Sequence, residues 1–85
     1  STELGAGHFA LYPNPTKGSI TLERAARGEQ ALVQVHAMSG SLVLQADWHA
    51  SATQLGMDVS TLPAGIYAVE VRTNEGVQVR RLVKQ

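Results

Sequence analysis

The chain has 85 residues, of which 44% are hydrophobic, and its formal net charge at pH 7 is zero. This length fits one domain with a single core, and the balanced charge argues against nucleic acid as a partner. The absence of cysteine excludes disulfide bonds and cysteine-based zinc sites but leaves the compartment open.

No apolar run approaches the roughly 18 residues of a membrane-spanning helix. The chain also opens without the basic and apolar leader that starts export. If the chain is exported, we therefore expect its leader to belong to a longer precursor.

Short runs of alternating apolar and polar residues, separated by turn residues, predict an all-β domain. The first run, His8–Tyr12, stops at Pro13-Asn14-Pro15, where two prolines remove backbone donors and force a turn. The other predicted strands are Gly18–Glu23, Ala31–Met38, Ser41–Asp47, Thr53–Val59, Ile66–Arg72 and Val77–Val83. Seven short strands at this spacing predict an immunoglobulin-like sandwich of two antiparallel sheets, with a small closed barrel as the alternative.

The stretch "TLPAGIY" before the sixth strand predicts a tyrosine corner, in which a tyrosine hydroxyl bonds to upstream backbone. Pro63 would fix the backbone, and Gly65 would permit a positive φ or a close approach. Tyr67 would pack inward with Val69 and Val71. The alternative is an ordinary loop that carries a core tyrosine.

The last predicted strand changes phase. Val77 and Val79 set one alternation, but the pair that follows Arg81, Leu82-Val83, is apolar on both faces. Either Arg81 lies inward and extends its charged end to solvent, or a β-bulge near Arg80 turns Leu82 inward. The pattern favours the bulge, or a strand end near the rim of the sandwich.

The sequence offers little catalytic chemistry, so we expect neither an enzyme nor a cofactor. His8, His36 and His49 lack the spacing of a metal site. Asp47 and Asp58 are single carboxylates at strand ends, where turn capping is the usual role. The chain has no nucleophile elbow, GxGxxG stretch or P-loop. Trp48 is either a sugar-stacking platform or a packing residue.

Three stretches, "LYPNPTKGSITL", "VQVHAMSGSLVLQ" and "MDVSTLPAGIYAVEVRTNEGVQVRRLVK", occur in this order. Together they resemble the C-terminal sorting domain of the bacterial type IX secretion system over Leu11–Lys84. The resemblance marks these motif residues as mainly structural: Tyr12, Pro13, Asn14, Pro15, Gly18, Gly40, Asp58, Leu62, Pro63, Gly65 and Tyr67.

The resemblance implies a secretion signal at the C-terminal end of a larger cargo protein. Cargo would pass through the periplasm, be recognised by the outer-membrane translocon, and end at the cell surface or outside. A sortase-like peptidase would then remove the domain and attach the cargo to anionic lipopolysaccharide. We expect residues 1–7 to be a linker remnant and residues 8–85 to be a monomeric sorting domain.

The translocon is expected to recognise the C-terminal segment, namely Arg80, Arg81, Leu82, Val83, Lys84 and Gln85. Arg80, Arg81 and Lys84 would otherwise only protect an exposed strand edge from accidental pairing. Deleting Leu82–Gln85 should abolish secretion and leave most of the sandwich folded.

Two other classes of function remain open. One is a retained immunoglobulin-like module that binds lipopolysaccharide or stabilises its parent, which a surface patch around Trp48 and His49 would favour. The other is a structural spacer, for which charge reversal at Arg80 and Arg81 would change nothing.

Overall fold

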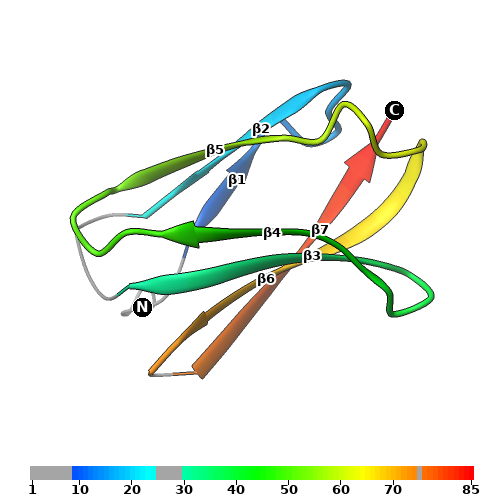
Figure 1. Cartoon of the computed structure of the whole chain (residues 1–85). Coiled ribbons are helices and arrows are strands. Elements are labelled where there is room, and N and C mark those ends of the chain that lie inside the picture. The colour runs from blue at the N-terminus through cyan, green and yellow to red at the C-terminus, as the bar shows by residue number, and fades with distance from the viewer. Residues whose placement is uncertain (1–8, 25–29, 75) are drawn as a thin grey trace.

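The computed structural model describes residues 9–24, 30–74 and 76–85, which form seven strands in two antiparallel sheets (Figure 1). The smaller sheet has the order β1-β2-β5 and the larger sheet the order β4-β3-β6-β7. The predicted immunoglobulin-like sandwich is confirmed, and the closed barrel is wrong. The strands are β1 (Ala10–Tyr12), β2 (Ser19–Glu23), β3 (Ala31–Ala37), β4 (Leu42–Trp48), β5 (Gln54–Asp58), β6 (Gly65–Thr73) and β7 (Gly76–Lys84).

The predicted strands match these bounds closely. His8, the predicted start of the first strand, and the predicted linker at residues 1–7 lie outside the described residues. The β3–β4 hairpin turns at Ser39-Gly40 as the sequence indicates, with Gly40 at a φ of +97°. Because β4 pairs with β3, it joins the sheet of β3, β6 and β7, whereas the fourth strand of a constant-type immunoglobulin domain joins the sheet of the first two strands.

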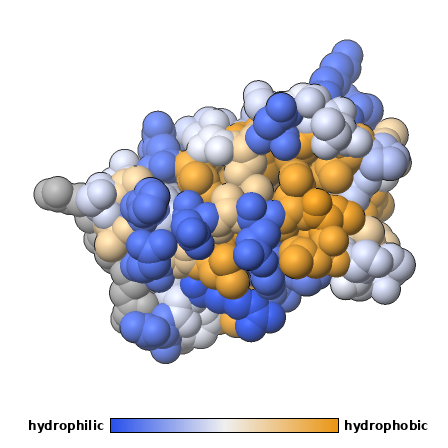
Figure 2. All heavy atoms as spheres, in the orientation of Figure 1, coloured by the Kyte–Doolittle hydropathy of each residue, from blue (hydrophilic) through white to orange (hydrophobic). Residues whose placement is uncertain are grey.

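The core lies between the sheets and is built from alternate residues of both. Tyr67, Val69 and Val71 of β6 all point into it, as predicted. Apolar side chains reach the surface around the β4 and β5 edges, where the two sheets part (Figure 2). The largest fully buried side chains are Trp48, Ile20, Leu22, Leu82, Val33, Val35, Val59 and Val69.

Strand β7 corrects one prediction. Its register with β6 runs without a shift from Gly65↔Lys84 to Thr73↔Gly76, so β7 contains no bulge and does not end at Arg80. Leu82 is buried opposite Tyr67, and this fixes the phase of the whole strand. Strict alternation then places the exposed Val77, Val79 and Arg81 on the outer face, so the predictions of a bulge and of an inward Arg81 are both wrong.

Candidate functional site

The turn after β1 sends one amide side chain to the edge strand β7. Pro13 and Pro15 flank Asn14, and the peptide bonds that precede both prolines are cis. Asn14 Nδ2 donates to the carbonyl of Arg81 at 2.7 Å, and the N–H of Val83 donates to Asn14 Oδ1 at 2.9 Å. The Asn14 side chain therefore pairs with β7 as the backbone of a neighbouring strand would.

Thr16 extends this pairing with two backbone hydrogen bonds. Its N–H donates to the carbonyl of Val83 at 2.9 Å, and the N–H of Gln85 donates to the Thr16 carbonyl at 2.8 Å. Thr16 and Lys84 thus form a parallel bridge. We call Arg81–Gln85 the sealed half of the β7 edge, because four hydrogen bonds from the first motif cover it.

Asn14 was expected only to lie in a turn and Thr16 was given no role, so their contact with β7 was not predicted. A usable signal was nevertheless present in the sequence. Pro13 and Pro15 have no N–H, so the amide of Asn14 is the group in this turn best able to offer both a donor and an acceptor.

The "TLPAGIY" stretch forms the predicted tyrosine corner beside the sealed half. The Tyr67 hydroxyl donates to the carbonyl of Pro63 at 2.6 Å, which confirms the prediction. Gly65 has a φ of +157°, a positive value as expected. In the register of β6 with β7, Gly65 faces Lys84 and Tyr67 faces Leu82. The corner therefore helps to position the sealed half.

A backbone hydrogen bond also joins the first and third motifs. The N–H of Val59 donates to the carbonyl of Gly18 at 2.8 Å. Asp58 Oδ1 accepts a hydrogen bond from the N–H of Ser60 at 2.9 Å, which is the predicted turn cap. Hydrogen bonds from Ser60, through its side chain and then its backbone, lower the pKa of Asp58. The motifs, far apart in sequence, meet at one end of the sandwich.

Part of the predicted recognition segment is buried. Leu82 is 0% exposed and Lys84 is 8% exposed. Lys84 Nζ donates to the carbonyl of Gln85 at 3.2 Å. Leu82 and Lys84 therefore hold the strand end in place and offer a receptor little surface.

The remaining residues of that segment lie nearer to solvent. Arg81 and Gln85 are exposed, whereas Arg80 and Val83 are half-buried. The Arg80 guanidinium lies over the Phe9 ring, 5.1 Å from its centroid. The charged surface of the segment is thus formed mainly by Arg81.

Trp48 is a core residue and offers no sugar-stacking surface. Its indole is 1% exposed, and its Nε1 donates to the carbonyl of Ala52 at 3.0 Å. The Phe9 ring meets it edge-on, with centroids 6.5 Å apart. The Arg24 guanidinium covers the indole at 4.6 Å and also bonds to the carbonyls of Ala52 and His49. No motif or pattern in the sequence indicates this role for Arg24.

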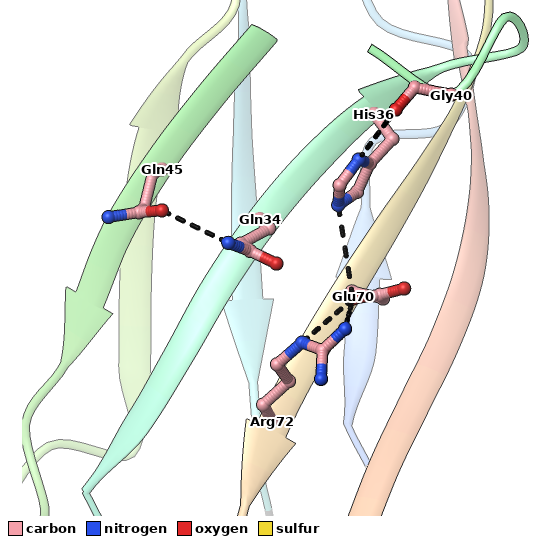
Figure 3. A network of polar contacts seen from close by, with 6 residues as sticks. All are labelled: Gln34, His36, Gly40, Gln45, Glu70 and Arg72. Carbon is pink, nitrogen blue, oxygen red and sulfur yellow. Dashed lines mark hydrogen bonds and ion pairs between the residues drawn. The ribbon is translucent and has the colours of Figure 1, made fainter. Parts of the chain in front are cut away.

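A polar network crosses the outer face of the larger sheet (Figure 3). Glu70 Oε1 accepts hydrogen bonds from the Arg72 guanidinium at 3.0 Å and lies 3.9 Å from His36 Nε2. Gln34 Nε2 donates to Gln45 Oε1 at 3.0 Å. Cross-strand pairs of this kind stabilise a solvated sheet face, and the network includes no nucleophile.

The described residues contain no group of three or more histidine and acidic side chains that could hold a metal ion. Within the same residues, no helix is long and apolar enough to cross a membrane. His36 lies on β3 and His49 follows the end of β4, and His8 is outside the described residues.

Comparison with known proteins gives one family and one fold. The family model of the secretion system C-terminal sorting domain matches residues 10–85. No curated protein matches the sequence. The chain resembles the crystal structure of a DUF3244 family protein with an immunoglobulin-like β-sandwich fold from Bacteroides vulgatus ATCC 8482. The TM-score is 0.78 at 15% identity, over 91% of this chain and 84% of that chain.

Proposed function

Because the chain belongs to the family of type IX secretion C-terminal sorting domains, we propose that the translocon reads it as a folded surface centred on the sealed half of β7. Membership in the family implies an attached cargo protein and secretion across the outer membrane to the cell surface or outside. The observation that carries the proposal is the contact of the first and third motifs at that one strand end.

The exposed part of the recognition segment supplies the contacts in this proposal. Arg81 and Gln85 face solvent, with Arg80 and Val83 partly accessible beside them. Leu82 and Lys84 act by keeping the strand end in the sandwich. A charged rim of this kind orients a partner and favours encounter more than it adds affinity.

Later steps complete the proposed route. Cargo travels through the periplasm, and proteins of the sortase complex cut the chain within residues 1–7 and attach the cargo to anionic lipopolysaccharide. The domain acts as a monomer throughout. A retained lipopolysaccharide-binding module would be favoured by a surface patch around Trp48, but that indole is buried.

A reporter fusion tests the proposal. The 85-residue chain is placed at the C-terminal end of a periplasmic reporter in a host with a type IX system, and reporter is measured at the cell surface and in the medium. Retention of the wild-type fusion in the periplasm would refute the sorting function. Detection of the domain still joined to surface reporter would refute the processing step.

The deletion of Leu82–Gln85 is a poor test of recognition. It removes a fully buried side chain, and it also removes the strand end to which Asn14 and Thr16 bond. Charge reversal by Arg81→Glu leaves these contacts in place, with Lys17→Glu on the exposed turn after β1 as a matched control. Equal secretion of both variants would favour the structural spacer.

A further inference from the structure

The free edge of β7 has a second part that the first motif does not cover. β7 is the last strand of the larger sheet, in the order β4-β3-β6-β7. The sealed half begins at the Arg81 carbonyl, and the preceding segment, Gly76–Arg80, is here called the open half. In Figure 1 the open half is the end of β7 away from the C-terminus.

The backbone of the open half presents hydrogen-bonding groups that no neighbouring strand pairs. In the sealed half, the groups that point away from β6 belong to Arg81, Val83 and Gln85. The register with β6 has no shift, so the same alternation directs the N–H and C=O of Val77 and Val79 to the free edge. No backbone group within the described ranges bonds to them. The Val79 carbonyl accepts one side-chain hydrogen bond, from Arg80 Nη1 at 3.2 Å.

The side chains beside this edge are apolar, with one cation. Val77 is 46% exposed and Val79 is 51% exposed, both on the outer face of the sheet. Arg81 follows them on that face, and its guanidinium forms no hydrogen bond or ion pair with a described residue. Edge strands usually avoid this combination, because backbone that no strand pairs, beside exposed valine, invites another strand.

We infer that an extended segment of a partner protein adds to the open half of β7 as a further strand. Its backbone pairs with Val77 and Val79 and takes the place of the Arg80 guanidinium at the Val79 carbonyl. Because neighbours on one face of a sheet contact each other, its outer-face side chains are two apolar residues and one acidic residue, the acidic one beside Arg81. The Asn14 turn closes the edge beyond this point and so limits where the incoming strand can lie. The inference rests on the proposed function, since the partner is taken to belong to the secretion machinery.

Two pairs of variants test the inference in the reporter assay. Val79→Pro removes an edge N–H that makes no bond within the sheet, a position where proline is tolerated. Val79→Ala is its control, because it keeps that N–H. Losing one such bond corresponds to an about tenfold loss of binding, so we expect Val79→Pro to lower secretion by about that factor and Val79→Ala to be much nearer to wild type. Arg81→Glu should lower secretion, and Arg81→Lys should retain it.

The controls separate the possible failures. If the wild-type fusion is not secreted, the sorting function itself is wrong. If the wild type is secreted and Val79→Pro is secreted equally well, strand addition is overturned and the sorting function stands. Thermal unfolding followed by Trp48 fluorescence shows whether Val79→Pro folds, and if it does not, the Arg81 pair decides.

A second copy of this chain is the competing occupant of the edge. Sedimentation of the purified wild-type chain and of Val79→Pro distinguishes the two occupants. A wild-type monomer supports the inference. A wild-type dimer that Val79→Pro dissociates would overturn it, because the open half would then pair with itself.

Discussion

Replacing Tyr67 by phenylalanine isolates the contribution of the tyrosine corner. The substitution removes only the hydroxyl, which donates to the Pro63 carbonyl at 2.6 Å. The ring stays buried opposite Leu82, so the packing of the core is kept. The variant therefore measures the hydrogen bond itself.

We expect Tyr67→Phe to lower the free energy of unfolding by about 1 kcal/mol, the usual net value of one such bond. Pro63 lies at the surface, where water can solvate the freed carbonyl, so no additional penalty for an unsatisfied buried group is expected. In a domain of this size, that loss lowers the melting temperature by roughly 4–8 °C. Urea unfolding should show a lower midpoint with an unchanged slope.

Tyr12→Phe is the matched control. The Tyr12 hydroxyl also makes a short hydrogen bond, to Glu23 Oε1 at 2.7 Å, and this bond raises the pKa of Tyr12. The pair is exposed, so water replaces the lost partner and stability should change less. An unfolding midpoint for Tyr67→Phe equal to wild type, or a larger loss for Tyr12→Phe, would refute this account of the corner.

Three further variants probe the motif residues. Asn14→Asp keeps the acceptor for the Val83 N–H but places an oxygen against the Arg81 carbonyl. It should lower the free energy of unfolding in urea by about 1–2 kcal/mol. A wild-type midpoint would contradict the pairing of Asn14 with β7. The pKa of Asp58 is lowered in the fold, so its stabilising contribution is present above the unfolded pKa and is lost as pH falls below about 4. Asp58→Asn should therefore flatten the acid branch of stability against pH, and an unchanged branch would disprove the assignment. Gly40→Ala must hold alanine at a φ of +97°, and should lower stability by about 1–2 kcal/mol; neutral behaviour in thermal unfolding would count against it.

Local patterns predicted the strands well because each strand has one buried face. In β2 the alternation of apolar residues matches burial residue by residue. In β6 every second residue from Tyr67 to Val71 is buried as predicted, whereas the apolar Ile66 before them is exposed. The corner was also predictable, because Pro63, Gly65 and Tyr67 are close in sequence and act on one another. Short-range chemistry therefore accounts for most of the fold.

In β7 the local pattern does not predict which side chains face the core. Val77 and Val79 have the composition of inward residues, yet the burial of Leu82 opposite Tyr67 sets the opposite phase. A strand keeps one phase unless a bulge interrupts it, so one well-packed residue decided the orientation of the others. Nothing local to β7 reveals which of its apolar residues has that role.

The candidate site was predicted only in outline for the same reason. Its residues were marked, but the bond from Asn14 to Arg81 spans 67 positions. Pairing over such a separation depends on the folded arrangement of whole strands. The stacking of Arg24 on Trp48, between β2 and β4, was hidden in the same way.

The hydrogen bonds between Asn14 and β7 can form only late in synthesis. During synthesis, the first motif leaves the ribosome long before Arg81–Gln85, and it has no edge to bond until those residues exist. A cargo whose translation stops short of residue 81 carries "YPNP" but cannot assemble the strand end beside it. Under the proposed function, such a cargo lacks the surface that the translocon recognises, and it is not secreted.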